Sequence, residues 1–173
     1  KNMVEIAKKR VPNAKFVVGN IKHTDFPSNY FDFALCSLVL DGMRDIGGVL
    51  SEINRILKPN GMLILIIRNP FITSTKQIGN KQKTIRKFNY YFNKYLIKYV
   101  WDEFRTKMPI YEFHRPMQEF IRGFISNGFA INDYFDLKPK KPKNRNEWFE
   151  YNLRVPKFMG FKLKKVEGSI LHS

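Results

Sequence analysis

The chain has 173 residues, 43% of them hydrophobic and 15% aromatic, a composition that favours one folded domain over a disordered chain. The single cysteine excludes an internal disulfide, and no apolar run is long enough to predict a transmembrane helix or a signal-peptide core, so we expect a cytoplasmic protein with no membrane partner. The net charge of +16, from 31 Lys and Arg against 15 Asp and Glu, keeps a nucleic-acid partner open, although the basic residues are spread along the whole chain.

The chain begins with a predicted helix followed by a predicted strand. Val4–Arg10 has the composition of a helix end, and a Pro-Asn turn at Pro12 follows it. Lys15–Gly19 is a short run with two valines that ends at Gly19 and Asn20, which predicts a strand closed by a turn.

The most informative stretch lies between Phe31 and Pro70, where one amphipathic helix separates two apolar runs. The helix is predicted over Asp45–Lys58, because Asp45 offers an N-cap acceptor and Pro59 begins a Pro-Asn-Gly stop. One face of this helix is apolar through Ile46, Val49, Leu50, Ile53, Ile56 and Leu57.

Two short, continuous apolar runs flank the helix. Phe33–Leu40 and Met62–Ile67 lack polar alternation, which predicts strands that are covered on both faces. The order strand, helix, strand predicts a parallel crossover unit. Cys36 lies within the first run, where a free cysteine is usually a small buried hydrophobe.

From residue 69 onward, the sequence pattern predicts a loop, further helices and several strands. A loop is expected at 69–80, a helix at 84–95, and a hairpin from 96–103 and 109–114 around 105–108. Pro116 opens a helix with apolar residues to Ile125, and Gly128 ends it. The last two strands are expected at 129–135 and 155–164.

Two regions carry denser positive charge. Lys76–Lys98 interleaves basic residues with Tyr90, Tyr91, Phe92 and Tyr95, a pattern that fits either a phosphate-binding, base-stacking surface or an amphipathic cover over a pocket. Lys138–Arg145 is a proline-lysine run, which favours a solvated loop over a binding site.

Three motifs carry a resemblance to a known family. They are the strand end FDFALCSLVL, the helix-to-strand turn ILKPNGMLIL and the helix HRPMQEFIRGFISNGF. Together they resemble the class I S-adenosylmethionine-dependent methyltransferases, in the small-molecule group called type 11, and the similarity covers nearly the whole chain.

The resemblance implies an α/β Rossmann-like sheet, mostly parallel, with an antiparallel last strand. It also implies a single partial domain over 1–173, with a small helix and hairpin lid inserted at about 69–116. The family's first strand, glycine-rich turn, helix and second strand have no counterpart here, so we expect a central gap in the sheet with exposed strand edges.

The resemblance also implies a set of cofactor contacts for S-adenosylmethionine. Asn20 stands where the family has an acid near the adenine, and Ile21 offers a backbone amide; a plain turn asparagine is an equally good interpretation of Asn20. Cys36, Ser37 and Leu38 would line the cofactor at the strand end, a position where open parallel sheets bind ligands.

Acceptor contacts are expected from the loops above the same edge. Asn69 and Phe71 follow the second strand, and Tyr111 and Arg115 lie near the end of the hairpin that would roof the pocket, although Arg115 could simply cap or pair. His114 is the first candidate for a general base and Asp41 the second, because imidazole takes a proton near neutral pH. No metal is expected.

Three functions follow from these observations. The first is methyl transfer to a small molecule, for which this 173-residue stretch alone is expected to bind the cofactor poorly. The second is an RNA or tRNA methyltransferase, motivated by the net charge. The third is a methyltransferase-like binding module without catalysis.

Overall fold

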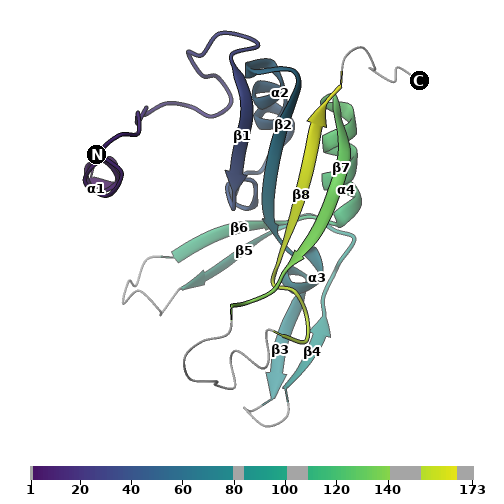
Figure 1. Cartoon of the computed structure of the whole chain (residues 1–173). Coiled ribbons are helices and arrows are strands. Elements are labelled where there is room, and N and C mark those ends of the chain that lie inside the picture. Colours follow the sequence, from purple (N-terminus) through teal and green to yellow (C-terminus); the bar gives the residue numbers. More distant parts are fainter. Residues whose placement is uncertain (1, 80–83, 101–108, 141–152, 167–173) are drawn as a thin grey trace.

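The structure is a computed structural model, and it describes residues 2–79, 84–100, 109–140 and 153–166. Its centre is a four-stranded sheet in the order β1-β2-β8-β7, from which two separate two-stranded hairpins project (Figure 1). The described residues hold no helix that is both long and apolar enough to cross a bilayer.

The predicted crossover unit is confirmed. It consists of β1 (Phe31–Ser37), α2 (Gly47–Ile56) and β2 (Leu57–Arg68), and β1 pairs with β2 in parallel. Asp45 acts at the start of α2 as expected, since its Oδ1 accepts a hydrogen bond from the backbone N of Gly47 at 2.9 Å.

The C-terminal part completes the sheet. α4 (Met117–Ser126) begins after Pro116, as predicted, and leads to β7 (Phe129–Leu137). β8 (Phe158–Lys165) lies between β2 and β7 and is antiparallel to both. Three of the four strands, β1, β2 and β7, therefore run in the same direction, and β8, the last strand in the chain, runs antiparallel to them, as the sequence predicts.

The core lies between the sheet and the two helices α2 and α4 (Figure 1). Apolar side chains from one side of β2 and β8 meet the apolar stripes of both helices, and burial of this area is the main stabilising contribution to the fold. The fully buried members are Leu40, Val49, Leu50, Leu57, Leu63, Leu65, Ile67, Phe124 and Leu163.

The opposite face of the sheet is open, and the prediction that both strands are covered on two sides is wrong. Phe33 and Leu35 on β1 are 55% and 63% exposed, and alternate residues of β2, such as Ile64, are only partly buried. Among the described residues, β1 pairs only with β2, so its other edge is free. The continuous apolar runs of β1 and β2 therefore include residues on a sheet face that no described element covers.

The predicted strand at 15–19 is absent. The chain is helical over α1 (Asn2–Arg10) and then runs without regular structure beside the free side of β1 (Figure 1). Val17 and Val18 are exposed, and the first strand-like contact is a single bridge between Asn20 and His23. A strand forms only against a partner, and no described strand lies next to these residues.

The segment between β2 and α4 begins with a short helix and a hairpin. α3 (Pro70–Thr73) leads into the hairpin of β3 (Thr75–Gly79) and β4 (Thr84–Phe88). The predicted helix over 84–95 is wrong, because its β-branched first half pairs with β3 instead.

The second hairpin is confirmed. β5 (Tyr95–Val100) pairs antiparallel with β6 (Pro109–His114), and the turn predicted at 105–108 lies outside the described residues. Most of the proline-lysine run at 138–145 lies outside them too. That the 69–116 segment forms a lid, within one partial domain, stays a prediction.

Candidate functional site

The carboxyl end of β1 combines open backbone with a strained residue. Ser37 is exposed, while Cys36 points into the core and is 5% exposed. Leu38 has a φ of 58°, a conformation that costs a residue with a Cβ energy and that is concentrated at functional sites. A ligand above this edge would therefore meet Ser37, Leu38 and the Cys36 backbone.

The thiol of Cys36 is unsuited to reactive chemistry. Burial raises its pKa to about 11, and the nearby Asp41 carboxylate adds to this shift. Because the thiolate is the nucleophile, Cys36 contributes shape and backbone to the site.

Asp41 lies in the short helix η1 (Leu40–Gly42) and is 6% exposed. Its two carboxylate oxygens accept hydrogen bonds from the backbone N of Arg68 at 3.3 and 3.1 Å. Burial raises the pKa of Asp41 to about 6, and the Glu112 carboxylate also raises it, against the lowering effects of the Arg68 amide and of the Arg68 and Arg115 guanidinium groups. The group can therefore exchange a proton close to neutral pH.

Arg68 links β2 to β6. It follows the apolar run of β2 and forms an ion pair with Glu112 of β6, and both side chains are largely buried. This pair places two opposite charges beside Asp41, so the carboxyl end of the sheet carries a compact ionic cluster.

Arg115 holds the turn that carries Asp41. It is 4% exposed, and its guanidinium donates to the carbonyl oxygens of Leu40 at 3.0 Å, of Met43, and of Arg44 at 3.4 Å. These contacts occupy much of its donor set, so Arg115 acts within this structure as a clamp between the end of β6 and η1.

Asn69 and Phe71 follow β2 in different environments. Asn69 is buried, its Oδ1 accepts from the Phe71 backbone N at 2.9 Å as the N-cap of α3, and its Nδ2 donates to the Pro156 carbonyl at 2.8 Å. Phe71 is 46% exposed and stacks on Tyr91 with ring centroids 5.0 Å apart. Of the two, Phe71 has a free face for an acceptor.

Both nitrogens of His114 are engaged. Nε2 lies 2.8 Å from the carbonyl oxygen of Tyr91, which can only accept, so Nε2 carries a proton and Nδ1 can accept from the Thr73 hydroxyl at 2.7 Å. Burial lowers the pKa of His114, which is 1% exposed and lies beside the Tyr95 ring. It could take up a further proton at Nδ1 only by giving up the hydrogen bond that it accepts from Thr73.

Tyr111 is the most exposed of the residues predicted to bind the acceptor. It is 47% exposed, and the Lys98 ammonium lies 5.8 Å from its ring centroid. It could contact an acceptor with no loss of buried structure.

Asn20 and Ile21 lie in the loop before β1. The Asn20 Oδ1 accepts from the Lys22 backbone N at 3.0 Å, which is an Asx turn, while Ile21 packs partly against the core. Both residues line a hollow of about 590 Å³ bounded by the loop that runs from Lys15 to Tyr30.

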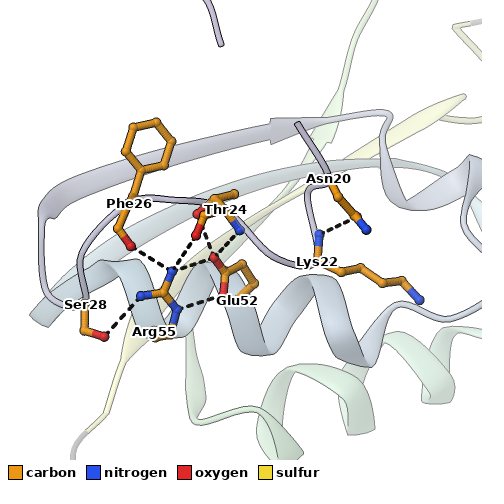
Figure 2. A network of polar contacts seen from close by, with 7 residues as sticks. All are labelled: Asn20, Lys22, Thr24, Phe26, Ser28, Glu52 and Arg55. Atoms are coloured by element: carbon orange, nitrogen blue, oxygen red, sulfur yellow. Dashed lines mark hydrogen bonds and ion pairs between the residues drawn. The ribbon is translucent and has the colours of Figure 1, made fainter. Parts of the chain in front are cut away.

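This loop is fixed to α2 by a network of charged hydrogen bonds (Figure 2). Glu52 accepts from the backbone N and hydroxyl of Thr24 at 2.8 and 2.6 Å, and Arg55 binds both Glu52 oxygens at 2.7 and 2.8 Å. Arg55 also donates to the carbonyl of Phe26 at 2.8 Å and to the Ser28 hydroxyl at 3.2 Å. The Arg55 and Thr24 bonds lower the pKa of Glu52 to about 2, so the charged network holds the loop at neutral pH.

The sequence interpretation missed Arg68, Glu112, Thr73 and the Glu52–Arg55 network. Only Arg68 left a signal, since a cation directly after a buried strand lies at the ligand-binding edge of a parallel sheet. The others depend on tertiary contacts between segments that lie far apart in the chain.

Comparison with known proteins agrees with this architecture. Residues 1–65 match the family model described as a methyltransferase domain. The chain is 28% identical over 154 residues to a demethylmenaquinone methyltransferase of Listeria monocytogenes serotype 4a, covering 81% of the chain and 65% of the relative. It is 30% identical over 154 residues to the enzyme of the same name from Listeria welshimeri, with the same coverage. The chain thus spans 65% of the length of these curated relatives.

Solved structures show the same fold. A putative S-adenosylmethionine dependent methyltransferase from Listeria monocytogenes matches with a TM-score of 0.77 and 22% identity, covering 96% of this chain and 77% of the other. One from Mesorhizobium loti matches with a TM-score of 0.76 and 16% identity, covering 95% and 76%.

The chain therefore has the fold of these S-adenosylmethionine-dependent methyltransferases.

Proposed function

We propose that the protein transfers the methyl group of S-adenosylmethionine to a small-molecule acceptor. The observation that carries this proposal is the carboxyl edge of β1, where the strained Leu38 and open Ser37 lie next to the buried acid Asp41. When bound, S-adenosylmethionine supplies a methyl group that is already activated by its sulfonium. Ser37, Leu38, Asn20 and Ile21 would hold it, and the remaining task of the protein is to position the acceptor and exclude water.

For the acceptor we propose a quinol ring, because the relatives are named demethylmenaquinone methyltransferases. Phe71, stacked on Tyr91, presents an aromatic surface suited to a flat ring, and Tyr111 offers a second one. Asn69 would act by fixing the start of α3, and Arg115 by holding η1, so both are positioning residues in this proposal.

Asp41 is the proposed general base. In the reaction the bond from sulfur to the methyl carbon breaks, a carbon-carbon bond to the ring forms, and the ring loses a proton. A carboxylate whose pKa is raised to about 6 can accept the proton of a ring hydroxyl near neutral pH and so increase the nucleophilicity of the ring. His114 is the second candidate. Its unprotonated Nδ1 lies against the Thr73 hydroxyl, so Thr73 would have to move before Nδ1 could accept a proton from the acceptor.

The test is transfer of a labelled methyl group by the full-length protein to a demethylated naphthoquinol. We expect transfer, and we expect Asp41→Asn to lower kcat roughly a hundredfold, the usual loss when a general base is removed. Asp133→Asn, at an exposed position on β7, is the matched control and should retain kcat. Labelling of tRNA in place of the quinol would favour the RNA alternative, and no transfer to either by the folded protein would favour a binding module.

A further inference from the structure

Three aromatic side chains face outward where the first lid hairpin meets the second. Phe88 is 61% exposed, Tyr90 70% and Phe92 80%. Tyr91, between them, turns the other way and stacks on Phe71. The segment therefore divides into an inner side that closes the lid and an outer side, Phe88, Tyr90 and Phe92, which we call the lid aromatic patch.

The backbone that carries this patch is well anchored. The Tyr91 hydroxyl accepts from the backbone N of Met117 at 3.1 Å, and the backbone N of Asn89 donates to the Ser74 carbonyl at 2.7 Å. The exposure of the three aromatic rings is thus a property of a fixed turn. Three large apolar side chains that are exposed within one five-residue segment mark a candidate interaction site.

The surroundings of the patch are positively charged. Lys76 and Lys87 are directly opposite each other on β3 and β4 and both are exposed, an arrangement that destabilises the hairpin unless an anion lies nearby. The sequence contains no Asp or Glu between Glu52 and Asp102, and within this segment Lys94 is paired with Glu119 of α4 at 2.6 Å.

We propose that the lid aromatic patch, with Lys76 and Lys87, docks the protein on an anionic lipid bilayer. Aromatic side chains prefer the bilayer interface, and each nearby lysine adds attraction to anionic headgroups. The next strand, β5, exposes Leu96 and Val100, which favour a lipid over stacked bases. Peripheral docking on a bilayer needs no membrane-spanning helix. A membrane partner is therefore compatible with the lack of such a helix in the sequence, although the sequence alone predicts none.

The proposal is tested by sedimentation of the full chain with vesicles. We expect binding to vesicles of 30% phosphatidylglycerol in phosphatidylcholine, weaker binding to pure phosphatidylcholine, and a further loss as salt is raised. The variant Phe88→Ser/Tyr90→Ser/Phe92→Ser should lower the partition coefficient by at least roughly tenfold, and Lys76→Ala/Lys87→Ala by roughly tenfold on anionic vesicles only. This readout requires neither methyl donor nor acceptor, so its failure is separate from failure of the proposed function.

The controls use exposed residues elsewhere. Met3→Ser/Val17→Ser/Val18→Ser and Lys138→Ala/Lys140→Ala remove equal numbers of apolar and basic side chains and should bind as wild type does. Hydrogen exchange of the wild type gives a second measurement, with protection by vesicles expected at residues 84–94. Absence of binding to anionic vesicles overturns the proposal. So does equal loss in patch and control variants, or tight binding to single-stranded RNA that depends on the patch while vesicle binding does not.

Discussion

Replacing Arg115 by alanine is expected to lower the free energy of unfolding by about 3–5 kcal/mol, the usual cost of removing one partner from a buried charged group. The change removes the donors to the Leu40, Met43 and Arg44 carbonyls and leaves Arg68 as the remaining cation that acts on Asp41. Urea unfolding followed by circular dichroism measures the effect.

Two further variants test whether the loss of stability comes from the carbonyl contacts of Arg115. Arg122→Ala, at an exposed position on α4, should change the free energy of unfolding by less than about 0.5 kcal/mol. Arg115→Lys should be intermediate, because an ammonium keeps the charge but cannot span several carbonyls. A loss below about 1 kcal/mol for Arg115→Ala would show that the clamp does not hold the end of β6 to η1.

The second large effect is a pH dependence of stability caused by Asp41. Its pKa is about 6 in the folded protein against an ordinary value of 3.8, so between these values the folded state binds more protons than the unfolded state. The contribution of Asp41 to the free energy of unfolding therefore falls as pH rises through this window, by up to about 3 kcal/mol.

Asp41→Asn isolates this contribution. The variant keeps an acceptor oxygen for the Arg68 amide but cannot ionise, so its stability relative to wild type should increase by up to about 3 kcal/mol between pH 4 and pH 7.5. Asp32→Asn provides a contrast of opposite sign, because Lys58 lowers the pKa of Asp32. A difference between Asp41→Asn and wild type that does not change with pH would mean that Asp41 is not held in a desolvated site.

The elements that could be predicted from the sequence are those with their own periodicity and end signals. The helix at Asp45–Lys58 and the helix after Pro116 each have an apolar stripe and a stop, and α2 and α4 follow them closely. The strand predicted at 15–19 and the helix predicted at 84–95 are both wrong, because strand formation depends on a partner elsewhere in the chain: 15–19 has none among the described residues, whereas 84–88 pairs with β3.

The site shows the same division. That Ser37, Leu38 and Asp41 lie at or just after the carboxyl end of β1 could be predicted from the strand pattern, and their role in binding stays a prediction. That Arg115 is a clamp, that Asn69 is a helix cap and that His114 has both nitrogens engaged follow from contacts with Leu40, Pro156 and Tyr91, for which the sequence carries no local signal.

The edge of the sheet formed by β1 exposes several apolar side chains. Phe33 and Leu35 are exposed on the free edge strand, and Val17 and Val18 are exposed on the loop that faces the same side. An edge with this much apolar surface pairs readily with further strands. Among the described residues nothing covers this apolar edge, so it is the part of the sheet best suited to pair with a further strand.

Binding of the methyl donor at the carboxyl edge of β1 is tested most directly by titrating the isotope-labelled full-length protein with S-adenosylmethionine and following its backbone amides by NMR. We expect saturable shifts at Asn20, Ile21, Ser37 and Leu38, with β7 unaffected. Saturable binding that leaves these four amides unchanged, or no binding by the folded full-length protein, would contradict the assignment of this edge to the methyl donor.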